Sequence, residues 1–201
     1  MIYEIDKDPY IDLKTGILRN LLDINNQSIL DQVEAEISAL KSAIILDNPI
    51  PGDLNLEYYQ NIHQILFSTI YQWAGKLRTI EISKGKTKFA SVAFLFESAK
   101  NVFDELNSDI ELDNLEDRDY SIKLAHYYSE INILHPFREG NGRTQRVFFS
   151  VLAQRSDRHI AWELLSKEEN EAACVQAYNG DDSYLVSVFN RVISSKNGVN
   201  L

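Results

Sequence analysis

The chain has 201 residues, a formal net charge of -10 and a pI of about 4.9, with 44% hydrophobic and 25% charged residues. This acidic balance excludes general adhesion to nucleic acid or anionic membranes, since both need clustered Lys and Arg, so any phosphate site must be local. Cys174 is the one cysteine, which excludes an internal disulfide, and the sequence shows neither a signal-like N-terminus nor an apolar run of about 20 residues. We therefore expect a cytoplasmic protein with a single domain, residues 1–201, no membrane partner and no direct nucleic-acid partner.

The first predicted helix covers residues 28–48, SILDQVEAEISALKSAIILDN. Ser28 followed by Asp31 has the pattern of an imperfect capping box. Apolar residues recur at the spacing of an amphipathic helix, at Ile29, Leu30, Val33, Ile37 and Leu40. We assign this helix to an N-terminal helical extension over about residues 10–50, ahead of a core over about residues 55–195.

Helical periodicity continues through most of the core. The segment LEYYQNIHQILFSTIYQWAG predicts a helix that ends near Ala74, because Gly75 supplies a stop. Further helical patterns cover residues 94–106, 118–134, 142–155, 167–178 and 184–194. The predicted fold class is therefore all-α.

One segment, LRTIEISKGKTKFASVAF, departs from helical periodicity. Its residues alternate over 79–82, turn at Lys84-Gly85 and resume at Thr87, which predicts a small β-hairpin flap over about residues 79–90. The exposed edge of such a hairpin can pair with an extended peptide. The alternative is a structural flap with no partner.

The stretch HPFREGNGRTQR, residues 135–146, combines the residue types of a phosphate site. Pro136 ends the preceding helix at His135, and the glycines around Asn141 open the next one. Because a helix N-terminus presents unpaired N–H groups and a positive dipole, the backbone from Gly140 to Gly142 can cradle phosphate oxygens. Arg143 and Arg146, three residues apart, are expected to share a helix face and add positive charge.

Two more residues of this stretch carry chemistry. Glu139 can hold Mg²⁺ together with phosphate oxygens, since hard cations are often held by one or two carboxylates plus substrate. His135 can accept a proton near neutral pH. We interpret Phe137 as an anchor that packs the loop onto the core and Arg138 as an exposed spacer. Together these residues indicate phosphoryl or nucleotidyl transfer.

The other reactive side chains have simpler interpretations. His63, His126 and His159 lie in amphipathic contexts without a glycine turn, so we expect packing or surface roles. Cys174 has no histidine nearby in sequence and is expected to be a small buried residue rather than a nucleophile.

The stretch from His135 to Arg146 resembles the complete signature of the Fic family, and the resemblance extends over nearly the whole chain, including the segments DPY, GILRN and KGKTKF. It implies a helical Fic core that transfers AMP from ATP to a protein hydroxyl with magnesium. By resemblance, His135 deprotonates a Ser, Thr or Tyr hydroxyl, Glu139 binds Mg²⁺, and residues 140–142 hold the α- and β-phosphates. The nucleotide-binding residues so implied are Gly140, Asn141, Gly142, Arg143, Arg146 and, in the flap, Lys84 and Gly85.

The resemblance also bears on donor and regulation. In the related Doc kinases a larger side chain replaces the second glycine of the motif, so the presence of Gly142 favours adenylylation. Many Fic proteins carry an inhibitory helix with Ser or Thr four residues before a Glu-Gly or Glu-Asn pair. Here the one such pair outside the motif is Glu169-Asn170, and Leu165 occupies the position of the hydroxyl residue.

The short chain and the missing inhibitory helix resemble the Fic toxins of bacterial toxin–antitoxin pairs. The resemblance implies a small antitoxin that carries the inhibitory glutamate, and a target protein docked at the flap, with DNA gyrase and topoisomerase IV as candidates. Two alternatives stay open: a Fic-type transferase with another nucleotide or phosphate-containing donor, and a nucleotide-binding interaction module without catalysis.

Overall fold

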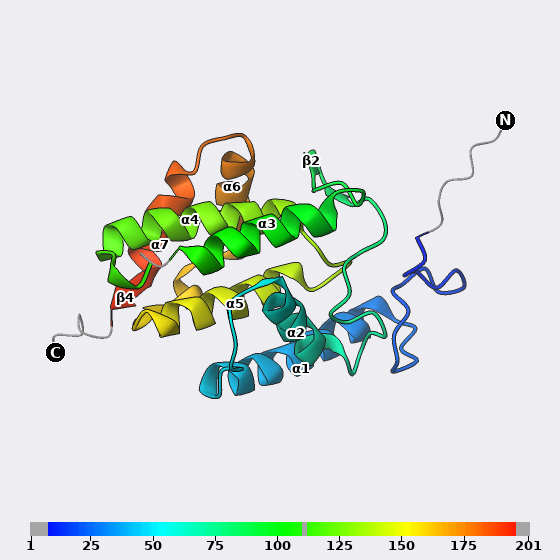
Figure 1. Cartoon of the computed structure of the whole chain (residues 1–201). Helices are drawn as coiled ribbons and strands as arrows, with labels where there is room; N and C mark the ends of the chain where they lie inside the picture. Colours follow the sequence, from blue (N-terminus) through cyan, green and yellow to red (C-terminus); the bar gives the residue numbers. More distant parts are fainter. Residues whose placement is uncertain (1–7, 110–111, 196–201) are drawn as a thin grey trace.

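The computed structural model describes residues 8–109 and 112–195, and in these residues the predicted all-α class with a small hairpin is confirmed (Figure 1). The helices are α1 (Gln27–Asp47), α2 (Leu56–Phe67), α3 (Leu95–Ser108), α4 (Asp117–Leu134), α5 (Asn141–Arg155), α6 (Lys167–Tyr178) and α7 (Ser183–Val192), with short 3-10 turns η1 (Leu112–Asn114) and η2 (Trp162–Leu164). No helix in the described ranges is both long enough and apolar enough to cross a membrane.

Helix α5 is the centre of the bundle. It runs between α1 and α2 on one side and α4 on the other, and Figure 1 shows it as the yellow helix in the middle of the molecule. Its side chains Phe148, Phe149 and Val151 are fully buried. Burial of each such side chain contributes about 1.5–3 kcal/mol, so α5 holds the bundle together and its N-terminus has a fixed place.

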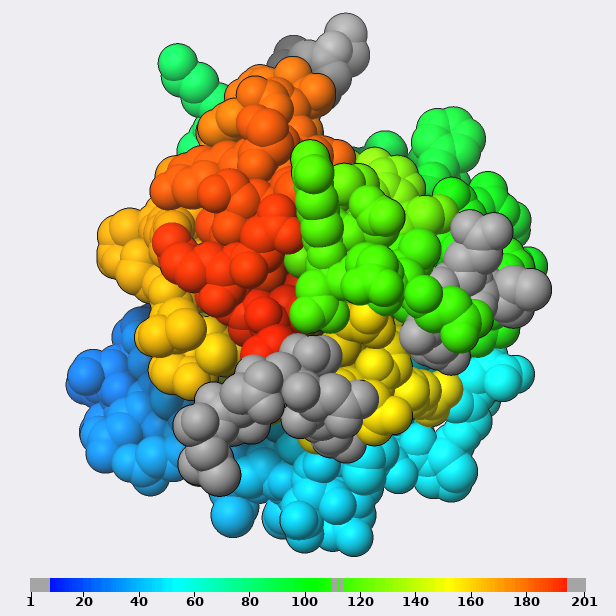
Figure 2. Space-filling view, turned by 90° about the vertical axis from the view of Figure 1, so that its left-hand side faces the viewer, coloured from blue at the N-terminus to red at the C-terminus, as the bar shows by residue number. Residues whose placement is uncertain are grey.

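The C-terminal helices close the end of the bundle that faces the viewer in Figure 2. Helix α7 packs against α4 and α6, and its red surface lies beside the green surface of α4. An unpredicted two-stranded antiparallel sheet pairs β3 (Arg158–Ile160) with β4 (Ile193–Ser195), with Ile160 opposite Ile193. A strand of three residues is too short to produce a recognisable alternating pattern.

Helix α1 forms where it was predicted but presents a different face to the core. Its N-cap is Asn26, whose side chain accepts from the Ile29 N–H, and not the predicted Ser28. The buried residues are Leu30, Glu34, Ser38 and Ile45, whereas Ile29 and Leu40 are 53% and 66% exposed. The polar pair Glu34 and Ser38 therefore lies inside and part of the apolar stripe lies outside.

Two boundaries differ from the prediction. Helix α2 ends at Phe67 and not near Ala74, because the chain turns back at once and the N–H groups of Ile70 and Tyr71 both bond the Phe67 carbonyl. The described part of the N-terminal extension before Gln27 is also not helical. It consists of turns with one bridge between Ile11 and Leu18.

The flap is shorter than predicted. Strands β1 (Ser83–Lys84) and β2 (Thr87–Lys88) pair antiparallel, and the turn is Gly85-Lys86 instead of Lys84-Gly85, with Gly85 at φ 60°. Residues 79–82 form no strand. At this base of the flap, side-chain hydrogen bonds take the place of strand pairing. The Glu81 carboxylate accepts from the Ser91 hydroxyl and from the Val92 N–H.

Candidate active site

His135 stands at the junction of α4 and the motif loop. As predicted, the helix stops here, and His135 caps it in a left-handed conformation with φ 42° and ψ 59°. Its imidazole stacks on the ring of Phe89, with centroids 3.8 Å apart and planes at 14°. Burial, together with the positive charges of Arg78 and Lys84, lowers the pKa of His135 to about 4, although a hydrogen bond with the Asn132 backbone acts in the opposite direction. At neutral pH the ring is therefore uncharged and able to accept a proton.

Arg78 ties the flap to this junction. Its buried guanidinium donates to the carbonyls of His135 (2.9 Å), Leu134 (3.3 Å) and Ile80 (2.8 Å), and also to the Ala90 carbonyl. The backbone N–H of Arg78 donates a hydrogen bond to the Pro136 carbonyl at 2.8 Å. A cation at the carboxyl end of α4 is favoured by the helix dipole. Both roots of the flap and the loop of His135 are therefore held by one side chain.

The loop between α4 and α5 is closed by Asn141. Its side-chain amide accepts from the Phe137 N–H (2.9 Å) and donates to the Phe137 carbonyl (2.8 Å). Phe137 is fully buried, so the predicted anchoring role is confirmed. The Asn141 side chain is thus directed into the loop, so that only the backbone of Asn141 is available for phosphate binding.

The two glycines of the motif differ in what surrounds them. Gly140 caps α5 with φ 81°, and a Cβ placed on it would lie 2.5 Å from the ring of Phe67. Gly142 lies in the first turn of α5, where a Cβ would meet no atom within 4 Å. Gly140 is therefore required by the fold, whereas the open space at Gly142 leaves the helix N-terminus accessible to a ligand.

Glu139 presents its carboxylate beside this helix N-terminus. The side chain is 45% exposed, its Oε1 accepts from the Gly140 N–H at 2.9 Å, and the same oxygen lies 3.4 Å from Arg143 Nη2. Among the described residues no group of three potential ligands gathers around a metal position. A single accessible carboxylate fits a Mg²⁺ ion that arrives with phosphate oxygens and keeps several waters, and does not fit an all-protein metal cage.

The two motif arginines, which are three residues apart on α5, contact different elements. The Arg143 guanidinium reaches α1, where it ion-pairs with Glu34, and lies 4.9 Å from the centroid of Phe67 on α2. Arg146 lies over the ring of Trp162 in η2, at 5.6 Å. Both arginines place positive charge near the N-terminus of α5.

His63 of α2 packs against the loop between α4 and α5. Its Nδ1 accepts from the Gly75 N–H at 2.8 Å, which leaves Nε2 to donate to the Glu139 carbonyl at 3.0 Å. Its ring stacks on Phe137 with centroids 3.8 Å apart. The predicted packing role is confirmed, and the ring also fixes the backbone of the residue expected to bind the metal.

This packing makes the stability of the protein depend on pH. Burial lowers the pKa of His63 to about 4, so the unfolded chain takes up a proton that the folded chain excludes. We expect the free energy of unfolding to fall as the pH decreases from about 6.5 to 4, by about 3 kcal/mol from this residue. Urea unfolding at several pH values measures it. His63→Gln is expected to lose this part of the slope, whereas the exposed control His126→Gln is expected to retain it.

The remaining predicted residues lie as follows. Lys84 forms an ion pair with Glu171 of α6 at 2.6 Å, and Gly85 forms the tip of the flap with open space around it. Arg138 is not an exposed spacer, because it is partly buried and ion-paired with Asp8 at 2.8 Å. Cys174 packs against the core, and burial raises its pKa to about 12.

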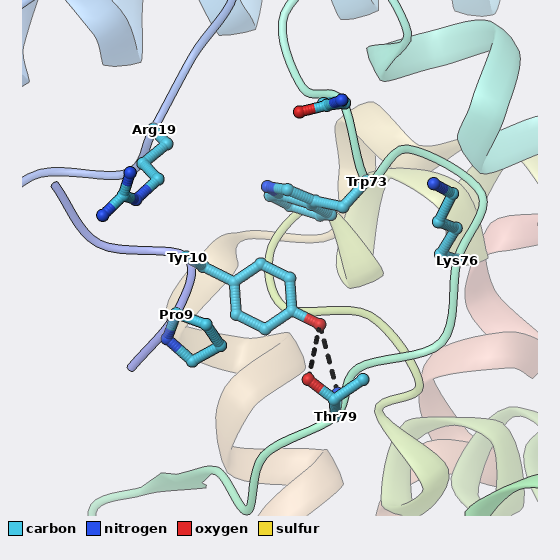
Figure 3. A pocket seen from close by; sticks show the side chains of 7 residues that line it. Pro9, Tyr10, Arg19, Trp73, Lys76 and Thr79 are labelled. Carbon is cyan, nitrogen blue, oxygen red and sulfur yellow. Dashed lines mark hydrogen bonds between the residues drawn. The ribbon is translucent and has the colours of Figure 1, made fainter. Parts of the chain in front are cut away.

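A pocket of about 300 Å³ adjoins the root of the flap but contains no motif residue (Figure 3). Its walls are Pro9, Tyr10, Arg19, Gln72, Trp73, Lys76 and Thr79. The Tyr10 hydroxyl accepts from the Thr79 N–H at 3.1 Å and so joins the N-terminal segment to the flap root. The stretch from His135 to Arg146 therefore lies outside this pocket.

Comparison with known proteins agrees with the motif and the fold. Residues 53–153 match the family model described as Fic/DOC family. The probable protein adenylyltransferase Fic of Escherichia coli (strain K12) is 36% identical over 188 residues, which cover 94% of this chain and 93% of that protein. The chain belongs to the Fic/DOC family.

Two further Fic proteins extend the comparison. The protein adenylyltransferase VbhT of Bartonella schoenbuchensis is 35% identical over 94% of this chain, and the chain spans 40% of the length of VbhT. The crystal structure of the BepC protein of Bartonella tribocorum, with bound AMPPNP, superposes with a TM-score of 0.86 at 22% identity, over 93% of this chain and 97% of that one. The Fic fold is therefore shared nearly end to end.

Three residues of the site were not found from the sequence. Phe89, Arg78 and Glu34 reach the motif from segments 46, 57 and 109 residues away, and none belongs to the stretch from His135 to Arg146. Phe89 was read only as part of the flap. An acid on the apolar face of a predicted helix was the one sign that could have pointed to Glu34.

Proposed function

We propose that this Fic protein transfers AMP from ATP to a Ser, Thr or Tyr hydroxyl of another protein. The observation that carries the proposal is the loop 135–142, which joins an uncharged, half-buried histidine to a helix N-terminus that is open at Gly142 and has one accessible carboxylate beside it. Its relatives support it, since VbhT is named a protein adenylyltransferase and the BepC structure contains AMPPNP.

In the proposed reaction, His135 accepts the proton of the target hydroxyl as the oxygen attacks the α-phosphorus of ATP. The bond from the α-phosphorus to the bridging oxygen breaks, AMP becomes esterified to the target, and pyrophosphate leaves. In this reaction the N–H groups at the start of α5 would orient the phosphates, and the charges of Arg143 and Arg146 would stabilise the leaving group. Mg²⁺, held by Glu139 and phosphate oxygens, would supply further charge neutralisation.

The flap is the proposed docking edge for the target. Its strands have two residues each, and Phe89 at its base stacks on His135. A peptide that adds to this edge would bring its hydroxyl next to the base. We further propose that the protein acts as a toxin restrained by a separate antitoxin that carries an inhibitory glutamate, and that DNA gyrase and topoisomerase IV are the first targets to test.

The experiment is transfer of label in a bacterial lysate. Purified protein, Mg²⁺ and α-labelled ATP are expected to label a discrete protein band, and γ-labelled ATP is expected to leave the same band unlabelled. Label from γ-labelled ATP would indicate phosphoryl transfer instead. Absence of label from every nucleoside triphosphate would contradict the proposal and favour a nucleotide-binding module.

The antitoxin proposal has its own test. Expression of the chain with its neighbouring reading frames is expected to yield a small co-purifying protein that suppresses labelling. A freely active protein that its host tolerates without a partner would contradict the toxin proposal and leave the transferase proposal intact.

A further inference from the structure

Glu34 is an acid in a position that helix packing would normally give to an apolar residue. It lies on the inner face of α1 with 6% of its surface exposed, between the buried residues Leu30 and Ser38. An isolated carboxylate in such a place is strongly unfavourable, so its partners must account for it. None of the motif's roles assigned above uses this residue.

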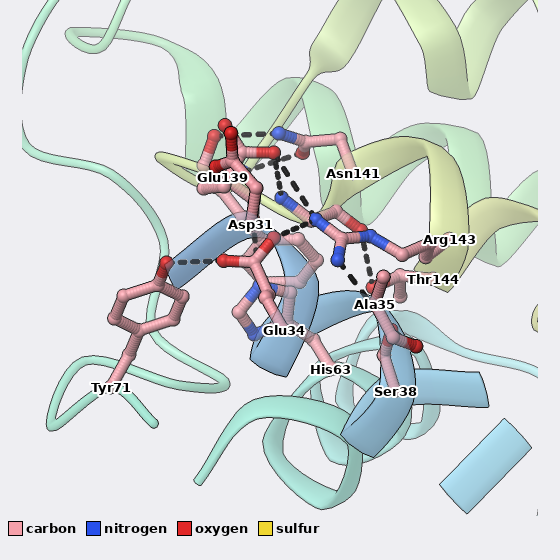
Figure 4. Close-up of polar contacts among 12 residues, drawn as sticks. Asp31, Glu34, Ala35, Ser38, His63, Tyr71, Glu139, Asn141, Arg143 and Thr144 are labelled. Atoms are coloured by element: carbon pink, nitrogen blue, oxygen red, sulfur yellow. Dashed lines mark hydrogen bonds and ion pairs between the residues drawn. The ribbon is translucent and has the colours of Figure 1, made fainter. Parts of the chain in front are cut away.

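Both oxygens of the Glu34 carboxylate have partners (Figure 4). Oε1 accepts from Nη2 of Arg143, and Oε2 accepts from the Tyr71 hydroxyl. Tyr71 comes from the loop that follows the early end of α2. Burial, together with the adjacent Glu34 carboxylate, raises the pKa of Tyr71, so the hydroxyl keeps its proton and donates.

Arg143 lies between two carboxylates. Its Nη2 binds Glu34 and is 3.4 Å from Oε1 of Glu139, while its Nη1 is 3.5 Å from the Ser38 hydroxyl. Figure 4 shows the guanidinium directed from α5 toward α1, with Glu139 on its other side. Residues 139 and 143 are four apart, so without Glu34 the arginine would have Glu139 as its remaining carboxylate partner.

We propose that Glu34, oriented by Tyr71, is a positioning residue that holds Arg143 on α1 and thereby keeps the Glu139 carboxylate available for the metal that accompanies the nucleotide. The proposal rests on the proposed function of the motif. It assigns Glu34 no contact with substrate. Its effect passes through Arg143, whose place it fixes, and through Glu139, whose competing ion pair it weakens.

The first test observes Arg143 without any need for turnover. In protein labelled with ¹⁵N-arginine, the Arg143 side-chain signal, assigned by its loss in Arg143→Lys, is expected to show hindered rotation of the guanidinium. Glu34→Gln is expected to shift this signal and increase the rotation rate. The matched control is Glu36→Gln, which removes the same charge from the exposed face of α1 two residues away.

The second test measures the metal requirement. The Mg²⁺ concentration that supports half-maximal AMP transfer is expected to rise about 10-fold in Glu34→Gln, as for other changes behind a metal ligand, and to stay unchanged in Glu36→Gln. In an Arg143→Lys background, Glu34→Gln is expected to have no further effect, because Glu34 acts through Arg143. An unchanged Arg143 signal and Mg²⁺ dependence in Glu34→Gln would overturn the proposal.

Two further measurements distinguish failure of the positioning role from unfolding of the variant and from failure of the proposed function. If Glu34→Gln is unfolded at the assay temperature, Tyr71→Phe takes its place and is expected to shift both readouts in the same direction by a smaller amount. If the wild-type protein transfers no AMP, the proposed function fails, and calorimetric titration of ATP with Mg²⁺ into wild type and Glu34→Gln, together with the arginine signal, still decides the positioning role. Equal Mg²⁺-dependent ATP affinity with an unchanged signal would reject it.

Discussion

Replacement of His135 by alanine is expected to lower the rate of AMP transfer by about 10²–10⁴-fold, the range for loss of a positioned general base. The imidazole is uncharged at neutral pH because burial lowers its pKa to about 4, so the wild-type ring is ready to accept the hydroxyl proton. The substitution leaves the backbone free to keep the contacts from Arg78. Initial rates with α-labelled ATP and the lysate target measure the effect.

The control for this prediction is His126→Ala, which removes an exposed imidazole on the same helix, α4, and is expected to leave the rate unchanged. Calorimetric titration should show that His135→Ala still binds ATP with Mg²⁺, because the phosphate cradle is intact. A variant that transfers AMP at more than a tenth of the wild-type rate would show that His135 is not the base.

The second large effect is a contrast between two neighbouring glycines. Gly140→Ala is expected to lower the free energy of unfolding by about 2–4 kcal/mol, since φ is 81° and the new methyl group would overlap the Phe67 ring. Gly142→Ala is expected to leave stability unchanged or raise it by up to about 1 kcal/mol, because the site is helical and open. Urea unfolding measures both.

In nucleotide binding we expect a large effect from Gly142→Ala, the variant whose stability is little changed. The methyl group of Gly142→Ala points into the space where we place the phosphates, so the affinity for ATP with Mg²⁺ should fall at least about 10-fold in a fully folded protein, as for loss of a close charge-assisted contact. Wild-type ATP affinity in Gly142→Ala would show that the phosphates do not approach the first turn of α5, and the proposed cradle would be wrong.

The sequence predicts the parts of this protein that are set by local chemistry. Pro136 marks the end of α4 at His135, the glycines mark the start of α5, and the span of α6 is predicted to the residue. These features depend on the conformational preferences of a few adjacent residues. The spacing of the motif likewise places its chemistry on one loop.

The parts that were predicted wrongly depend on distant contacts. The extent of α2 was overestimated because its apolar period continues past Phe67, where the chain already turns to bring Tyr71 to Glu34. The face of α1 was assigned by hydrophobicity, but the buried face includes Glu34, whose partner Arg143 lies 109 residues away in the sequence. The hairpin was predicted to be too long, because side-chain hydrogen bonds of Glu81 replace strand pairing over residues 79–82.

If a target docks at the flap as proposed, the Arg78 guanidinium would link that docking thermodynamically to the protonation of His135. It binds carbonyls at both roots of the flap and the carbonyl of His135, so displacement of the flap perturbs the backbone that carries the imidazole. A coupling free energy of this kind is reciprocal. Whatever a docked target does to the proton affinity of His135, protonation of His135 must do in equal measure to the affinity for that target.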